Sequence, residues 1–135
     1  MRWLVLSSTL ACGCSERLGV RVHGERDAEP LLLEASELLG IWLEAGDGPI
    51  VLELVDVAPG EPVGRLLVER SCLRVIRATR SPIVIAHEVG HALGLQHVDD
   101  PLNVMAVYTD DESVALTDEQ RSTMEKTMRN LGGCP

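Results

Sequence analysis

The sequence predicts an α+β fold, in which a small twisted mixed sheet packs against two helices and a third helix follows near the C-terminus. Four short runs of residues have the composition and alternation of strands, and three segments have the periodicity or the terminal residues of helices. The chain has 135 residues, of which 45% are hydrophobic. That length suits one domain with a core and is too short for two ordinary domains.

The N-terminal half is expected to hold one helix among the strands. Apolar residues recur at three- and four-residue spacing from Pro30 to Ala45, and the sequence GDGP (46–49) then interrupts the pattern. An amphipathic helix is therefore predicted over these residues. The runs that predict strands are residues 18–24, 49–57, 64–69 and 72–79.

A second helix is predicted from residue 82 onward. Ser81 is suited to the N-cap of this helix, and Pro82 is suited to its first position, where a backbone N–H would have no partner within the helix. His87 and His91 then lie inside this helix.

The last helix is predicted to begin after Thr117. Thr117 and Gln120 have the spacing of a capping box, in which each side chain hydrogen-bonds the backbone N–H of the other residue. Acidic residues occupy the first turn, and Gly132 is expected to end the helix. Its apolar stripe is expected to belong to the core and consists of Met124, Met128 and Leu131.

The N-terminus has the composition of an export signal. Residues 1–14 combine one basic residue, a short apolar run and a stretch of small residues. Their LACGC segment resembles the lipobox of bacterial lipoprotein signals, in which Cys14 would carry a lipid anchor. Cleavage to a free secreted protein and a frayed N-terminus without a signal stay open as alternatives. We expect an extracytoplasmic protein, secreted or lipid-anchored at a bacterial cell envelope, with residues 15–135 as its single domain.

Charge and cysteine content limit the partners and the compartment. The formal charge is −9 at pH 7, and Lys126 is the only lysine. Nucleic acid is excluded as a partner, because phosphates must be neutralised by basic residues; a monomer is expected. Beyond residue 14 the thiols are Cys72 and Cys134, which in an oxidising compartment can form a disulfide or stay as two unrelated thiols.

Three of the four histidines lie within eleven positions, residues 87–97. On a helix His87 and His91 point the same way one turn apart, so both can reach one metal ion at about 2.0 to 2.1 Å. Gly94 can adopt a left-handed conformation that ends the helix and returns the chain, so that His97 reaches the same ion. Three histidine ligands leave a fourth position open, which is typical of a catalytic zinc site.

Glu88 is adjacent to the first of these histidines. Zinc lowers the pKa of water to about 7, so a neighbouring carboxylate can accept the proton of an attacking water at neutral pH. Glu88 is therefore the predicted general base, and hydrolysis of a peptide bond is the expected reaction.

The sequence HEVGHALGLQH (87–97) resembles the metzincin metalloprotease motif HExxHxxGxxH at every fixed position and is most similar to the matrixin branch. The resemblance implies a zincin-like sheet with an active-site helix, a packing helix and a C-terminal helix, divided into an N-terminal part (15–97) and a C-terminal part (98–135). It also implies a Met-turn beneath the metal ion, for which Met105 is the candidate; an ordinary core methionine is the alternative. The match extends from the active-site helix to Met105, and Val98 departs from the polar residue usual after the third histidine.

Tyr108 is a further candidate for supporting the site. In astacin- and serralysin-like metzincins a tyrosine two residues after the methionine approaches the zinc, whereas Tyr108 lies three residues after Met105. This offset argues against ligation. Tyr108 can line the pocket or assist the oxyanion, or it can be a packed tyrosine, and both alternatives stay open.

These residues predict a zinc-dependent endopeptidase that uses one catalytic zinc ion and acts on protein or peptide substrates. The alternative is a non-catalytic zinc- or peptide-binding module that keeps the three histidines. Glu88 disfavours this alternative, because a module that only binds metal needs no general base. A structural zinc protein is disfavoured by the open fourth position.

Overall fold

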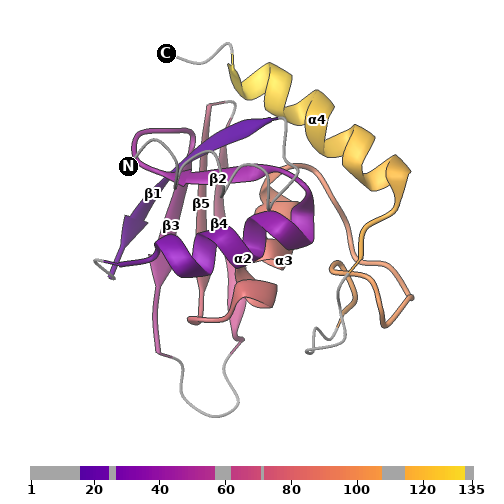
Figure 1. Cartoon of the computed structure of the whole chain (residues 1–135), viewed down its shortest axis with the longest axis horizontal. Helices are drawn as coiled ribbons and strands as arrows, with labels where there is room; N and C mark the ends of the chain where they lie inside the picture. The colour runs from indigo at the N-terminus through magenta and orange to yellow at the C-terminus, as the bar shows by residue number, and fades with distance from the viewer. Residues whose placement is uncertain (1–15, 25–26, 57–61, 71, 108–114, 133–135) are drawn as a thin grey trace, which may run out of the picture.

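The computed structural model describes residues 16–24, 27–56, 62–70, 72–107 and 115–132. A five-stranded mixed sheet forms its centre, in the order β2-β1-β3-β5-β4 (Figure 1). Three of the strand pairs are parallel, and β4 joins β5 antiparallel at one edge. The strands are β1 (Arg17–His23), β2 (Trp42–Ala45), β3 (Ile50–Leu54), β4 (Gly64–Arg70) and β5 (Leu73–Ala78).

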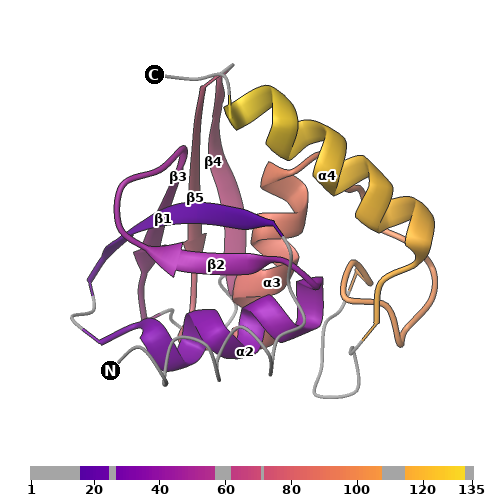
Figure 2. The ribbon, with the colours of Figure 1, turned by 45° about the horizontal axis from the view of Figure 1, so that its top comes forward.

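The helices of the described residues are α2 (Glu29–Leu39), α3 (Pro82–Ala92) and α4 (Asp118–Gly132). Helices α2 and α3 cover one face of the sheet, and α4 lies on the side of α3 away from α2 (Figures 1 and 2). The predicted α+β class with a small mixed sheet is confirmed. Among the described residues, no helix has the length and apolar character that crossing a bilayer requires.

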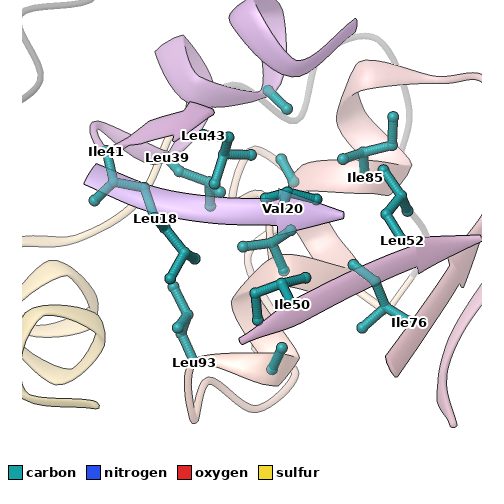
Figure 3. Packing of buried hydrophobic residues seen from close by; sticks show 14 of the residues in the cluster. Leu18, Val20, Leu39, Ile41, Leu43, Ile50, Leu52, Ile76, Ile85 and Leu93 are labelled. Carbon is teal, nitrogen blue, oxygen red and sulfur yellow. The ribbon is translucent and has the colours of Figure 1, made fainter. Parts of the chain in front are cut away.

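One cluster of buried aliphatic side chains joins the sheet to its helices. The central strands are buried on the helix-facing side, as expected for parallel strands under a helical layer. Figure 3 shows the contact between strand residues Val20, Ile50, Leu52 and Ile76 and the residues Leu39, Ile85 and Leu93 from the helical layer.

The predicted helix over Pro30 to Ala45 is too long. The observed helix α2 ends at Leu39, because Gly40 adopts a left-handed conformation with φ of 73° and its N–H bonds to the carbonyl of Ser36. The chain then reverses, and Trp42–Ala45 forms strand β2 beside β1. The apolar spacing continues through this reversal, so the periodicity conceals the end of the helix and a fifth strand.

The predicted N-termini of the other two helices are confirmed, whereas the predicted C-terminus of α4 is not. The Ser81 hydroxyl accepts from the N–H of Val84 at 3.4 Å. Thr117 and Gln120 form the capping box, with bonds of 2.8 and 3.1 Å. Helix α4 includes Gly132 instead of ending before it. The predicted core residues of α4 are buried, namely Met124, Met128 and Leu131.

Several predictions concern residues outside the described ranges. Cys72 is disulfide-bonded, but Cys134 lies outside the described residues, so the pairing of these two cysteines stays a prediction. The export signal over residues 1–14 and the lipid anchor at Cys14 also lie outside them, as does Tyr108.

Candidate metal centre

Helix α3 carries two histidines, His87 and His91, whose Nε2 atoms lie 3.1 Å apart. The imidazole Nδ1 of His87 lies 2.8 Å from the carbonyl of Val104, and that of His91 lies 2.9 Å from the carbonyl of Leu95. A carbonyl oxygen only accepts, so each Nδ1 carries the proton and donates it. The two Nε2 atoms are then unprotonated and free to bind a metal ion.

Gly94 brings the third histidine to the same place. Its φ is 94°, a conformation that glycine adopts readily and other residues rarely adopt. A side chain here would also lie 3.2 Å from Oγ1 of Thr127, so α4 packs directly over this turn. The chain reverses at Gly94, and the exposed His97 returns so that its Nε2 lies 3.1 Å from Nε2 of His91.

The three Nε2 atoms of His87, His91 and His97 form a triangle whose sides are each 3.1 Å. A point about 2.05 Å from all three, the usual Zn–N distance, lies about 1 Å out of their plane and subtends angles of about 98° between nitrogens. These angles are close to tetrahedral, so the three residues fit a zinc ion with a fourth position open. At this spacing their lone pairs would repel one another, and a shared cation removes that repulsion.

Burial shifts the pKa values of the groups on α3. It lowers the pKa of His87 and of His91, although the hydrogen bonds to Val104 and Leu95 act in the opposite direction. Burial also raises the pKa of the Glu88 carboxyl to about 7. Neutral imidazoles, the form that binds metal, are thereby favoured near pH 7.

Met105 lies against the middle of the histidine helix. It is fully buried, and its sulfur lies 2.5 Å from the position that a Cβ on Gly90 would take. Gly90 stands between His87 and His91 in the sequence, so its missing side chain gives Met105 access to the helix beneath both ligands. Met105 also accepts the N–H of Val98, next to His97, at 3.0 Å.

The candidate site opens into a cleft of about 700 Å³ between α3 and strand β4 at the edge of the sheet. Two exposed apolar side chains, Val63 and Val107, stand at its walls. Glu88 is 5% exposed and reaches toward the edge strand, where a Cβ on Gly64 would lie 2.8 Å from both its Cγ and its Oε2. The cleft therefore places the three histidines and a buried carboxyl beside an exposed strand.

Two polar residues that support this region were not predicted from the sequence. Arg74 on β5 is 9% exposed, and its Nε donates to the carbonyl of Ala92 at the C-terminus of α3, at 3.2 Å. This bond places a positive charge where the helix dipole is negative. The only indication in the sequence is that Arg74 lies two positions before Ile76, so both side chains point to the buried face of β5. Asn103, which is 3% exposed, has no sequence signal that we can identify.

The matrixin family model matches residues 26–127, which is most of the chain. Metalloproteinase-II from Bacteroides fragilis is a structural neighbour with a TM-score of 0.59 and 14% identity, over 83% of this chain and 53% of that one. The chain thus spans about half the length of that protein. Archaemetzincin from Methanopyrus kandleri has a TM-score of 0.57 and 16% identity, over 84% of this chain and 96% of that one. The two structures show that the fold is of the metzincin type, and the family match shows that the chain belongs to the matrixin family of metallopeptidases.

Proposed function

We propose that this chain is a zinc-dependent endopeptidase that hydrolyses protein or peptide substrates. The observation that carries the proposal is the triangle of three unprotonated ring nitrogens with 3.1 Å sides, which opens into a cleft lined by Glu88. The matrixin membership and the two metalloproteinases of similar fold support it.

The proposal assigns one role to the three histidines and another to Glu88. His87, His91 and His97 hold the zinc ion. A zinc ion held there would polarise a substrate carbonyl and lower the pKa of water. Glu88 accepts the proton of the attacking water and delivers it to the leaving amine. Burial raises the pKa of its carboxyl, so Glu88 holds a proton more readily than an exposed carboxyl does, which suits delivery of that proton to the leaving amine.

The substrate is proposed to bind as an extended strand along β4. Among the described strands β4 pairs only with β5 and stands at the edge of the sheet, and an edge strand offers backbone N–H and C=O groups to a peptide. Gly64 on β4 lies directly against Glu88, so a peptide added here would pass beside the proposed base. Val63 and Val107 offer apolar contacts to its side chains.

Gly64 should be intolerant of a methyl group. Its backbone is outside the left-handed region, so alanine is allowed conformationally, but the new Cβ would lie 2.8 Å from Glu88 and 2.9 Å from Val84. Displacing a reacting group by about 1 Å can lower turnover by on the order of 10²-fold. Gly64→Ala is therefore expected to keep its zinc and lose kcat by about 10-fold or more, measured by peptide hydrolysis and metal analysis. A wild-type kcat in Gly64→Ala would show that the added methyl group leaves Glu88 in place.

The alternative function is a zinc- or peptide-binding module without hydrolysis. The histidine triangle and the edge strand suit such a module equally well. Glu88 favours hydrolysis, because burying a carboxyl is unfavourable and a binding module gains nothing from it.

Metal analysis combined with a peptide-library cleavage assay tests the proposal. The purified chain should contain one zinc per molecule and cleave internal bonds of some peptides. A chelator should stop cleavage, and added zinc should restore it. Full zinc occupancy without cleavage across a broad library would favour the binding module instead.

We also propose an extracytoplasmic location for a monomeric protein, secreted or anchored through Cys14. The support is the composition of residues 1–14 and the disulfide at Cys72, since disulfides persist mainly in oxidising compartments.

A further inference from the structure

We propose that Asn103 and Gln120 are positioning residues of the metal centre, because their paired side-chain amides fix the segment 103–105 that holds the histidines in place. This inference rests on the proposed zinc peptidase function. It assigns a role to two residues that touch neither the metal nor the substrate.

The two amides form a reciprocal pair. Nδ2 of Asn103 donates to Oε1 of Gln120 at 2.8 Å, and Nε2 of Gln120 donates to Oδ1 of Asn103 at 3.1 Å. Backbone groups fix the orientation of both amides: Oδ1 of Asn103 also accepts the N–H of Met105, and Oε1 of Gln120 also accepts the N–H of Thr117, each at 2.8 Å. A backbone N–H can only donate, so neither amide can be reversed without losing a bond.

Each residue of the segment 103–105 makes a separate link. Asn103 joins it to the start of α4 through Gln120. Val104 accepts the Nδ1 proton of His87 with its carbonyl at 2.8 Å. Met105 places its sulfur against Gly90 of α3 and accepts the N–H of Val98, next to His97. The segment therefore contacts His87 itself and one residue adjacent to each of His91 and His97. The amide pair joins the segment to α4.

The bond from His87 to Val104 makes the position of this segment important for the metal. It keeps the proton on Nδ1 and leaves Nε2 unprotonated. If the Val104 carbonyl moved, His87 would lose both its orientation and its preferred proton position. Replacing groups that orient metal ligands in this way typically weakens metal binding by about 10- to 100-fold.

Gln120→Glu separates the two roles of Gln120, which are capping helix α4 and pairing with the amide of Asn103. Glutamate also serves in a capping box, so its carboxylate can still accept the N–H of Thr117 and α4 keeps its start. The Nε2 donor is lost, however, and a second acceptor oxygen faces Oδ1 of Asn103. We expect zinc affinity to fall about 10-fold or more and the absorption spectrum of the cobalt-substituted protein to change. Gln120→Met, which has no amide, should give the same direction of change.

Thr117→Ala is the matched control. It removes the other half of the capping box, the 3.1 Å bond from the N–H of Gln120 to Oγ1 of Thr117, and leaves the amide pair intact. Its melting temperature should fall, while its zinc affinity and cobalt spectrum stay as in the wild type. Unchanged affinity and spectra in both Gln120 variants would overturn the proposal, as would equal changes in Thr117→Ala. A wild-type chain that binds neither metal would overturn the proposed function itself, and this inference with it.

Discussion

Glu88→Gln is expected to lower peptide hydrolysis by about 10² to 10⁴-fold while zinc content and folding stay near those of the wild type. Glutamine has almost the same shape as glutamate, and at this buried position it removes a group that is costly to ionise. It cannot accept a proton from water, so the step assigned to Glu88 is lost. The hydrogen bonds that orient His87 and His91 run to the carbonyls of Val104 and Leu95 and not to Glu88, so the arrangement of these ligands should survive.

Glu34→Gln is the matched control for this variant. Glu34 is exposed on α2, so the same chemical change is made away from the cleft, and wild-type kcat/KM is expected. A loss of less than tenfold in Glu88→Gln at equal zinc occupancy would mean that another group activates the water.

His97→Ala is expected to abolish tight zinc binding, and peptide hydrolysis with it. The variant keeps His87 and His91, but two ligands on one helix complete only half of a tetrahedral site. His97 is exposed, so its removal takes little packing from the core. The loss can therefore be ascribed to the missing ligand and not to unfolding.

His23→Ala provides the comparison, because His23 is an exposed histidine on β1. Zinc affinity measured by competition with a chelator, together with the spectrum of the cobalt-substituted protein, should be unchanged in His23→Ala and lost in His97→Ala. Full-strength zinc binding in His97→Ala would show that the ligand assignment is wrong.

The sequence was sufficient wherever a local rule decides the structure. The four-residue spacing of His87 and His91 needs only a helix, and the reversal at Gly94 needs only a residue that tolerates positive φ. The caps of α3 and α4 depend likewise on a few neighbouring residues.

The predictions failed where contacts between distant parts of the chain determine the structure. Gly40 could have ended a helix, but the apolar residues after it keep a helical spacing, and only pairing with β1 makes them a strand. Arg74 and Asn103 are buried polar residues whose partners, Ala92 and Gln120, lie 18 and 17 positions away. Periodicity carries no information about such partners. The contact between Gly64 and Glu88 depends in the same way on how β4 docks beside α3.

The short sequence separation of the three histidines has a thermodynamic consequence. A ligand stabilises a fold only to the extent that it prefers the folded chain to the unfolded one. Since His87 and His97 are separated by ten positions, the loop that joins them closes at a small entropic cost even without a sheet. The unfolded chain therefore retains some affinity for zinc, and the metal raises the free energy of unfolding by less than its affinity for the folded site would give.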